Sequence, residues 1–225
     1  MATNILETIT TQIKLVDASL DIIQAVQQRL GVDVDGECGP QTLTAFYHFK
    51  KSNSLGEPDY LGPTTAKKLM EKVRCTPSVV LALAASTLGY SESPAGSNKS
   101  KFGAWYGAQG QPWCASWVSW VFYHAGLPLP ATTPKGFAYC PYGVKWFRDK
   151  GQFFKQPKAG DVVFFDWQKD GISDHVGIVE KVNSDGTVTT IEGNTSASNN
   201  SNGGQVQRRV RPMGVIQGFG RPNWS

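Results

Sequence analysis

Apolar residues in the first third of the chain recur at the spacing of α-helices. Over residues 13–30 this spacing predicts one helix that ends before Gly31, with its apolar positions at Leu15, Ala18, Ile22, Val26 and Leu30. Residues 42–51 and 64–72 predict two further helices by the same criterion. The first third is therefore expected to contain three helices.

The second and third of these helices follow an internal repeat. Gly39-Pro40-Gln41-Thr42 recurs as Gly62-Pro63-Thr64-Thr65, with Gly, Pro and Thr each displaced by 23 residues. Proline is tolerated in the first helical turn because its missing N–H would have no partner there. Each copy therefore predicts a tight turn that opens a helix.

The pattern changes after Thr76-Pro77, a capping residue followed by a helix-starting proline. Helices are predicted over residues 78–88 and from about Trp113 to Gly126, with a loop over residues 90–111 between them. β-rich runs follow, separated by Gly, Asp and Asn turns, at residues 161–165, 175–182, 187–191 and 206–210. Residues 193–204 are almost wholly Gly, Asn, Ser and Thr and predict a solvated connector before the last of these strands. We expect a domain over residues 1–75 and an α+β domain over residues 76–225, with helices on one side of an antiparallel sheet.

Charge differs between these two domains. Residues 1–75 carry 8 Lys and Arg against 9 Asp and Glu, while residues 76–225 carry 14 against 9. A mildly basic second domain favours an anionic polymer such as a cell wall, but the dense Lys and Arg clusters of a nucleic-acid groove are missing. The longest apolar run, residues 79–85, is far shorter than the roughly 20 residues that cross a bilayer. We therefore expect no nucleic-acid partner, no membrane insertion and no signal peptide.

The repeat and its neighbours resemble the type 1 peptidoglycan-binding domain. The similarity covers roughly residues 15–73 and rests on Asp35-Gly36, Gly39-Pro40-x-Thr42, Ala45, Phe49, Leu55, Gly62-Pro63-x-Thr65 and Leu69. It implies a three-helix bundle that binds the cell wall. A three-helix dimerisation or spacer domain is the alternative.

Cys114 stands at the predicted start of a helix, directly after Trp113. Unpaired N–H groups and the helix dipole stabilise an anion there, so a thiolate is favoured. His48 falls in the first domain and His124 within the Cys114 helix, and neither is expected to be catalytic. His175, at the first position of a predicted strand, remains as the base that a cysteine nucleophile needs.

A third group is needed to orient the imidazole of His175. Side chains alternate along a strand, so Glu192 and Asn194 point the same way at the end of theirs. If the strands pair in the matching register, the imidazole faces a carboxylate and an amide. We expect Cys114 as nucleophile, His175 as base and Glu192 as its acceptor, with Asn194 as a further polar orienter.

Four blocks in this order resemble the CHAP family of cysteine amidohydrolases. They are residues 113–120 (WCASWVSW), 160–165 (GDVVFF), 175–179 (HVGIV) and 191–195 (IEGNT), and the similarity covers about residues 78–224. The resemblance implies a papain-like α+β fold. It also implies a cysteine that attacks an amide carbonyl in peptidoglycan, either between glycan and stem peptide or within the peptide.

Several other residues have two interpretations. Trp105, Tyr106, Trp113 and Trp167 are candidates for a substrate groove, with burial in the core as the alternative. Cys140 is expected to be structural, and Cys38 and Cys75 either form a disulfide or stay separate thiols. Some CHAP domains carry an acidic calcium loop before the nucleophile. Here residues 97–101 contain no carboxylate, so we expect no metal there and no cofactor.

The sequence therefore predicts an endolysin-like peptidoglycan amidase or endopeptidase that acts as a monomer on the bacterial cell wall. Without a signal peptide it would reach the wall after lysis, through a secretion machine or on a phage particle. Two alternatives are a non-catalytic wall-binding or virion structural protein with a CHAP-like fold, and an enzyme that transfers the acyl group to another acceptor.

Overall fold

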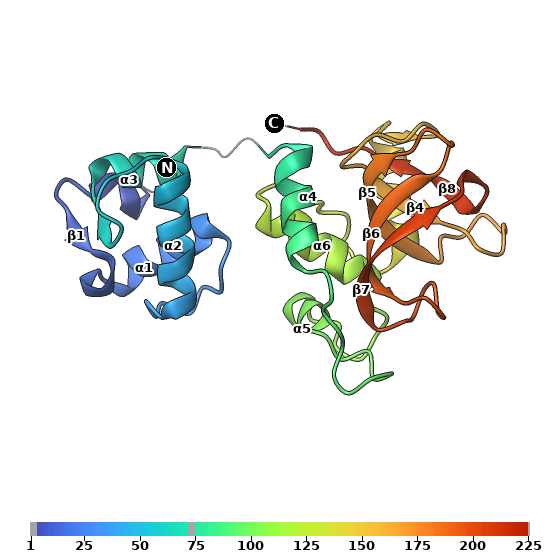
Figure 1. Ribbon diagram of the computed structural model, residues 1–225, viewed down its shortest axis with the longest axis horizontal. Helices are drawn as coiled ribbons and strands as arrows, with labels where there is room; N and C mark the ends of the chain where they lie inside the picture. The colour runs from blue at the N-terminus through green and yellow to red at the C-terminus, as the bar shows by residue number, and fades with distance from the viewer. Residues whose placement is uncertain (1–3, 72–74, 225) are drawn as a thin grey trace. The chain divides into compact units, whose positions relative to one another are not determined.

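The computed structural model describes residues 4–71 and 75–224 (Figure 1). The chain divides into two compact units, Met1–Val73 and Arg74–Ser225. The first unit buries apolar side chains around Val26 and Phe46, and the second around Trp117 and Phe164. Each unit therefore has a hydrophobic core of its own.

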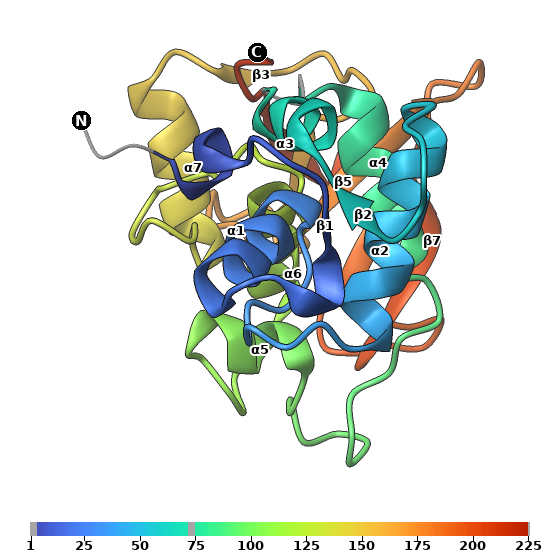
Figure 2. The same cartoon turned by 90° about the vertical axis from the view of Figure 1, so that its left-hand side faces the viewer.

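Three α-helices are present in the described part of the first unit, as predicted (Figure 2). They are α1 (Leu20–Leu30), α2 (Pro40–Ser52) and α3 (Pro63–Met70), and a two-stranded antiparallel sheet of β1 (Ile13–Lys14) and β2 (Tyr60–Leu61) accompanies them. The 3₁₀ turns η1 (Ile5–Thr8) and η2 (Leu15–Asp17) precede α1. Lys72, the end of the third predicted helix, lies outside the described residues.

The predicted helix over residues 13–30 is wrong in its first part. Helix α1 begins only at Leu20, after the N-cap Ser19. Ile13 pairs with Leu61 in the small sheet, and the Leu15 N–H donates to the Asp59 carbonyl at 2.9 Å. Both Ile13 and Leu15 contact the same core as the helix, so their apolar spacing continues the helical pattern without a helix.

Both Gly-Pro pairs open helices. Pro40 and Pro63 are the first residues of α2 and α3, and the glycine before each is the extended N-cap residue. The first of the two Gly-Pro-x-Thr turns therefore serves α2 and the second serves α3.

The buried amide of Gln27 in α1 holds the loop that leads into α2. Its Oε1 accepts a hydrogen bond from the Gly36 N–H at 2.9 Å, and its Nε2 donates to Asp35 Oδ1 at 2.6 Å and Thr42 Oγ1 at 3.0 Å. Gly36 has φ +78°, a conformation that favours glycine. The Asp-Gly and Thr residues of the sequence motif therefore build this loop.

Helices precede strands in the second unit. The helices are α4 (Pro77–Ser86), α5 (Lys101–Tyr106), α6 (Cys114–His124) and α7 (Cys140–Asp149). The strands are β3 (Phe153–Phe154), β4 (Val162–Phe165), β5 (His175–Val182), β6 (Val188–Thr195), β7 (Gln205–Arg211) and β8 (Ile216–Gly220), with the 3₁₀ turn η3 (Met213–Val215) before β8. They form one antiparallel sheet in the order β3-β8-β4-β5-β6-β7.

Helices α4 and α6 pack against one face of this sheet (Figure 1). Along β4, Val162 and Phe164 belong to the core that these helices share, while Val163 and Phe165 belong to a second apolar cluster. This alternation means that the two sets point to opposite faces, so the sheet is buried on both sides. The predicted papain-like α+β architecture is confirmed.

The second unit also contains elements that the sequence did not predict. The predicted loop over residues 90–111 includes α5, whose N-cap Ser100 accepts a hydrogen bond from Gly103 N–H at 2.9 Å. Helix α7 and strands β3 and β8 were also missed, so β7 is followed by one more strand. Among the described residues no helix is long and apolar enough to span a membrane.

Candidate active site

Cys114 is the first residue of α6, and its side chain is 4% exposed. Packing fixes this end of the helix, because the Trp117 indole N–H donates to Thr87 Oγ1 at 3.0 Å. The backbone N–H of Ala115 forms a hydrogen bond that lowers the pKa of the Cys114 thiol. The predicted placement of this thiol at a helix N-terminus is confirmed.

Of the aromatic residues proposed for a substrate groove, Trp113 is buried in the core, and Trp105 and Tyr106 are half-buried. Trp113 is fully buried, its indole N–H donates to Glu92 Oε2 at 2.8 Å, and it is a core residue rather than a groove residue. Tyr106 is half-buried and donates from its hydroxyl to the Gly136 carbonyl at 3.2 Å. Trp105 is also half-buried, with the Lys135 ammonium 5.2 Å from its ring centre. Trp105 and Tyr106 therefore contact the loop after α6, which contains Lys135 and Gly136.

His175, the first residue of β5, is fully buried. It pairs with Phe165 of β4, and because paired residues share a face, the two rings stack with centres 5.7 Å apart. Its Nε2 lies 3.1 Å from Glu192 Oε2. Its Nδ1 has no hydrogen-bond partner within the described residues, and the negative charge of Cys114 raises the imidazole pKa against the effect of burial. The imidazole therefore links the thiol to the carboxylate.

Glu192 reaches His175 across a glycine of the neighbouring strand. A Cβ at Gly177 would stand 2.7 Å from Glu192 Cγ and 3.0 Å from the Ile191 carbonyl oxygen. The absence of a side chain at Gly177 thus leaves the space that the Glu192 side chain occupies. One sequence block therefore supplies both the imidazole, at His175, and the space that the Glu192 side chain needs, at Gly177.

Arg211, the last residue of β7, was not predicted as part of the site. Its Nε donates to Glu192 Oε1 at 2.8 Å and its Nη2 to Oε2 at 2.6 Å, and its side chain is 6% exposed. Thr190 Oγ1 also donates to Glu192 Oε1 at 2.6 Å. A buried bidentate pair fixes the carboxylate plane as well as its charge. No sequence signal separated Arg211 from the other arginines of β7, Arg208 and Arg209.

Asn194 forms no hydrogen bond with His175, contrary to what alternation after Glu192 predicts. The β6–β7 register shifts between Glu192 and Thr195, and Asn194 has φ +58°. Its Oδ1 accepts from the Gly204 N–H at 3.1 Å, and its Nδ2 donates to Asn202 Oδ1 at 3.0 Å. Asn194 therefore holds the loop between β6 and β7 and forms no hydrogen bond with the imidazole.

The charges within the site support one another. Burial alone would lower the pKa of His175, but Cys114 and then Glu192 raise it to about 9. Burial would raise the pKa of Glu192, but the hydrogen bonds from Arg211 and His175 lower it to about 2. The pKa of Cys114 is held well below its ordinary value, first by a hydrogen bond from Cys140 and then by the charge of His175, against the effect of burial. The site therefore favours a thiolate, an imidazolium and a carboxylate near neutral pH.

Cys140 is the second residue that the sequence did not place in the site. It is the first residue of α7, and its Sγ lies 3.7 Å from Cys114 Sγ. Cys38 and Cys75 are also free thiols, so the alternative without a disulfide holds. Cys75 is buried in the core of the second unit.

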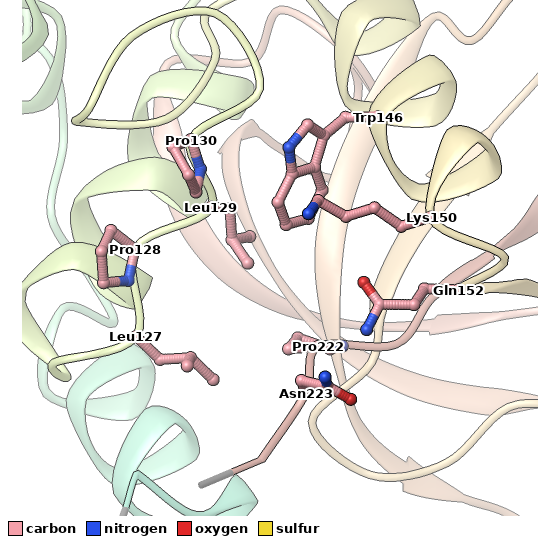
Figure 3. Close-up of a pocket in the computed structure, with 9 residues that line it drawn as sticks. All are labelled: Leu127, Pro128, Leu129, Pro130, Trp146, Lys150, Gln152, Pro222 and Asn223. Carbon is pink, nitrogen blue, oxygen red and sulfur yellow. The ribbon is translucent and has the colours of Figure 1, made fainter.

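One cavity of the second unit, of about 400 Å³, lies away from these groups (Figure 3). It is lined by Leu127, Pro128, Leu129, Pro130, Trp146, Lys150, Gln152, Pro222 and Asn223. The first four follow the C-terminal end of α6, whereas Cys114 is at its N-terminal end. The cavity is therefore separate from the thiol. In the described part of the chain, no three His, Cys, Asp or Glu side chains converge as metal ligands would.

Residues 105–194 match the sequence model of the CHAP domain family. The matched segment contains Cys114, His175, Glu192 and Asn194, and it ends before Arg211. No curated protein matches the chain.

Proposed function

We propose that this chain, whose residues 105–194 match the CHAP domain family, hydrolyses an amide bond of peptidoglycan with Cys114 as the nucleophile. The observation that carries the proposal is that Cys114, His175 and Glu192 are buried in one domain, with His175 Nε2 3.1 Å from Glu192 Oε2 and with Cys114 and His175 each shifting the pKa of the other. These three residues supply a nucleophile, a proton carrier and an orienting carboxylate.

The first half of the proposed reaction uses the ion pair of the Cys114 thiolate and the His175 imidazolium. The Cys114 thiolate attacks the amide carbonyl carbon, and a C–S bond forms as the carbonyl oxygen becomes negative. The positive end of α6 favours this developing anion. The His175 imidazolium then gives its proton to the leaving nitrogen, the C–N bond breaks, and an amine departs from a thioester.

The second half releases the acyl group. Neutral His175 takes a proton from water, which attacks the thioester carbonyl, and the C–S bond breaks as the carboxylic acid leaves. Glu192 stays ionised throughout because Arg211 and Thr190 hold its oxygens, so it fixes the ring and favours its protonated form. In this account Glu192 orients the imidazole and Asn194 does not.

We also propose that the first unit binds peptidoglycan. The proposal is supported by the motif around Asp35 and Thr42, which the Gln27 amide holds in a defined loop, and by the three-helix arrangement that the resemblance implies. The unit would hold the second unit near its polymer rather than take part in the chemistry.

Mass spectrometry of fragments released from purified peptidoglycan tests the function and identifies the bond. New amino termini on alanine next to the glycan would indicate an amidase, and termini inside the stem or cross-bridge would indicate an endopeptidase. Binding to insoluble peptidoglycan without new amino termini would instead support the non-catalytic alternative and overturn the proposal.

A further inference from the structure

Two thiols face one another at the candidate active site. Cys114 begins α6 and Cys140 begins α7, their sulfur atoms are 3.7 Å apart, and the side chains are 4% and 5% exposed. A disulfide has an S–S length of about 2.05 Å, so the two sulfur atoms must approach by less than about 2 Å to bond. Cys140 lowers the pKa of Cys114 through their hydrogen bond, but it makes and breaks no bond in the hydrolytic steps above.

The two thiols are chemically unequal. The pKa of Cys140 is raised well above its ordinary value, first by its hydrogen bond to Cys114, then by burial and by the negative charge of Cys114. The pKa of Cys114 is lowered by the same hydrogen bond. Near neutral pH one sulfur is therefore a thiolate, which reacts with oxidants, and its neighbour is a thiol that stays protonated.

We infer that Cys140 is a site of reversible oxidative modification, at which it forms a disulfide with Cys114 after peroxide has oxidised Cys114. The inference rests on the proposed function only for the thiolate at Cys114. It adds a regulation by oxidation that hydrolysis does not require.

The chemistry balances in two steps. The Cys114 thiolate attacks one oxygen of hydrogen peroxide, an S–O bond forms, the O–O bond breaks, and hydroxide leaves with sulfenic acid on Cys114. The Cys140 sulfur then attacks the Cys114 sulfur, the S–S bond forms and the S–O bond breaks. The departing oxygen takes up the Cys140 proton and leaves as water. A dithiol reverses the modification by thiol–disulfide exchange and is itself oxidised to a disulfide.

The other cysteines lack this arrangement. Burial raises the pKa of Cys75 to about 11, and burial also raises the pKa of the half-buried Cys38. Within the described residues the Cys114–Cys140 pair is the one sulfur–sulfur contact. The disulfide would occupy the proposed nucleophile, so the oxidised enzyme is inactive, and it would protect Cys114 from irreversible oxidation to sulfinic acid.

The test uses the reduced full-length protein exposed to a limited dose of hydrogen peroxide. Peptide mapping under non-reducing conditions should find a cross-linked peptide pair that contains Cys114 and Cys140. Peptidoglycan cleavage should be lost and should return with dithiothreitol. The Cys38→Ser variant, which changes a thiol outside the pair, should behave as the wild type in both respects.

A Cys140→Ser variant separates the inference from simple oxidation of Cys114. Dithiothreitol also reduces sulfenic acid, so this variant and the wild type are compared after excess peroxide. Without Cys140, Cys114 should then go on to sulfinic acid and the activity of the variant should stay lost after dithiothreitol, while the wild type recovers. Absence of the cross-linked pair in the oxidised wild type would overturn the inference, as would full recovery of Cys140→Ser from excess peroxide. The mapping needs no substrate, so a disulfide in a protein that cleaves no peptidoglycan would contradict the proposed function and leave the inference intact.

Discussion

At the scale of single residues, the site is a series of buried charged groups in which each charge is stabilised by the neighbouring one. Arg211 holds Glu192, Glu192 holds His175, and His175 faces Cys114. A buried charge is costly unless a partner compensates it, so removing one member changes the protonation of its neighbours.

Replacement of Glu192 by glutamine should weaken the ion pair while the fold persists. The amide keeps a hydrogen-bond acceptor but loses the charge that helps raise the His175 pKa to about 9. Because that pKa is raised, the imidazolium is present below it and is lost as pH rises through about 9. We expect the alkaline limb of cleavage near pH 9 to move to lower pH in Glu192→Gln, and the rate near neutral pH to fall roughly 10-fold to 1,000-fold.

The pH profile of Cys114 alkylation measures the same change without substrate. Asn194→Ala is the comparison, since Asn194 contacts Gly204 and Asn202 and should leave the profile nearly unchanged. A profile that shifts in Asn194→Ala and stays fixed in Glu192→Gln would assign the orienting role to Asn194.

Replacement of Arg211 by methionine should destabilise the second unit. It leaves the buried Glu192 carboxylate without its bidentate partner, and breaking a buried pair costs about 3 kcal/mol or more. The control is Arg208→Met on the same strand, whose partner is Glu180 and whose side chain is 49% exposed, so we expect less than about 1 kcal/mol. Urea unfolding of both variants measures the difference, and equal midpoints would show that the Arg211 pair contributes little.

Residue identities could be predicted from the sequence only where a local pattern marked them. Cys114 and His175 stand at the starts of a helix and a strand that periodicity revealed. Arg211 and Cys140 could not be found in this way, because their partners are brought to them by β6–β7 pairing and by the approach of the first residues of α6 and α7. Asn194 was misplaced because alternation assumes a regular strand.

At the scale of elements, the antiparallel pairing of β5 and β6 sets the distance between the His175 imidazole and the Glu192 carboxylate. Gly177→Ala would place a Cβ against Glu192 Cγ and the Ile191 carbonyl. We expect a loss of about 1–3 kcal/mol in unfolding free energy and a clear loss of cleavage, because the Glu192 side chain must move from His175. Gly214→Ala is the matched control, with open space around the added carbon. Unchanged cleavage by Gly177→Ala would show that this contact does not position Glu192.

The elements that the sequence predicted are those with long, regular patterns. Helix α6 and strands β4 and β5 lie close to the expected ranges. Helix α5 is short and contains Gly103, and β8 is short and contains two glycines, so neither carries a strong pattern. Helix α1 was extended too far because a core-facing strand and turn continued its apolar spacing.

At the scale of the whole molecule, the two units have separate cores and different charge. Residues 76–225 alone should therefore retain cleavage of soluble muropeptides, while their rate on intact sacculi falls at least about 10-fold, because the first unit supplies local concentration. Parallel assays of the full chain and of residues 76–225 on both substrates measure this. Equal rates on sacculi would identify the first unit as a spacer or dimerisation element, and a pull-down of residues 1–75 with insoluble peptidoglycan checks its binding directly.

The most direct test of the account is the release of new amino groups from purified peptidoglycan by the wild type and by Cys114→Ala. The variant removes the sulfur that forms the thioester and leaves the fold, so we predict that release falls to background. Cys38→Ala, which removes a thiol of the first unit, is the matched control and should release amino groups at the wild-type rate. Near-normal release by correctly folded Cys114→Ala would contradict the cysteine mechanism.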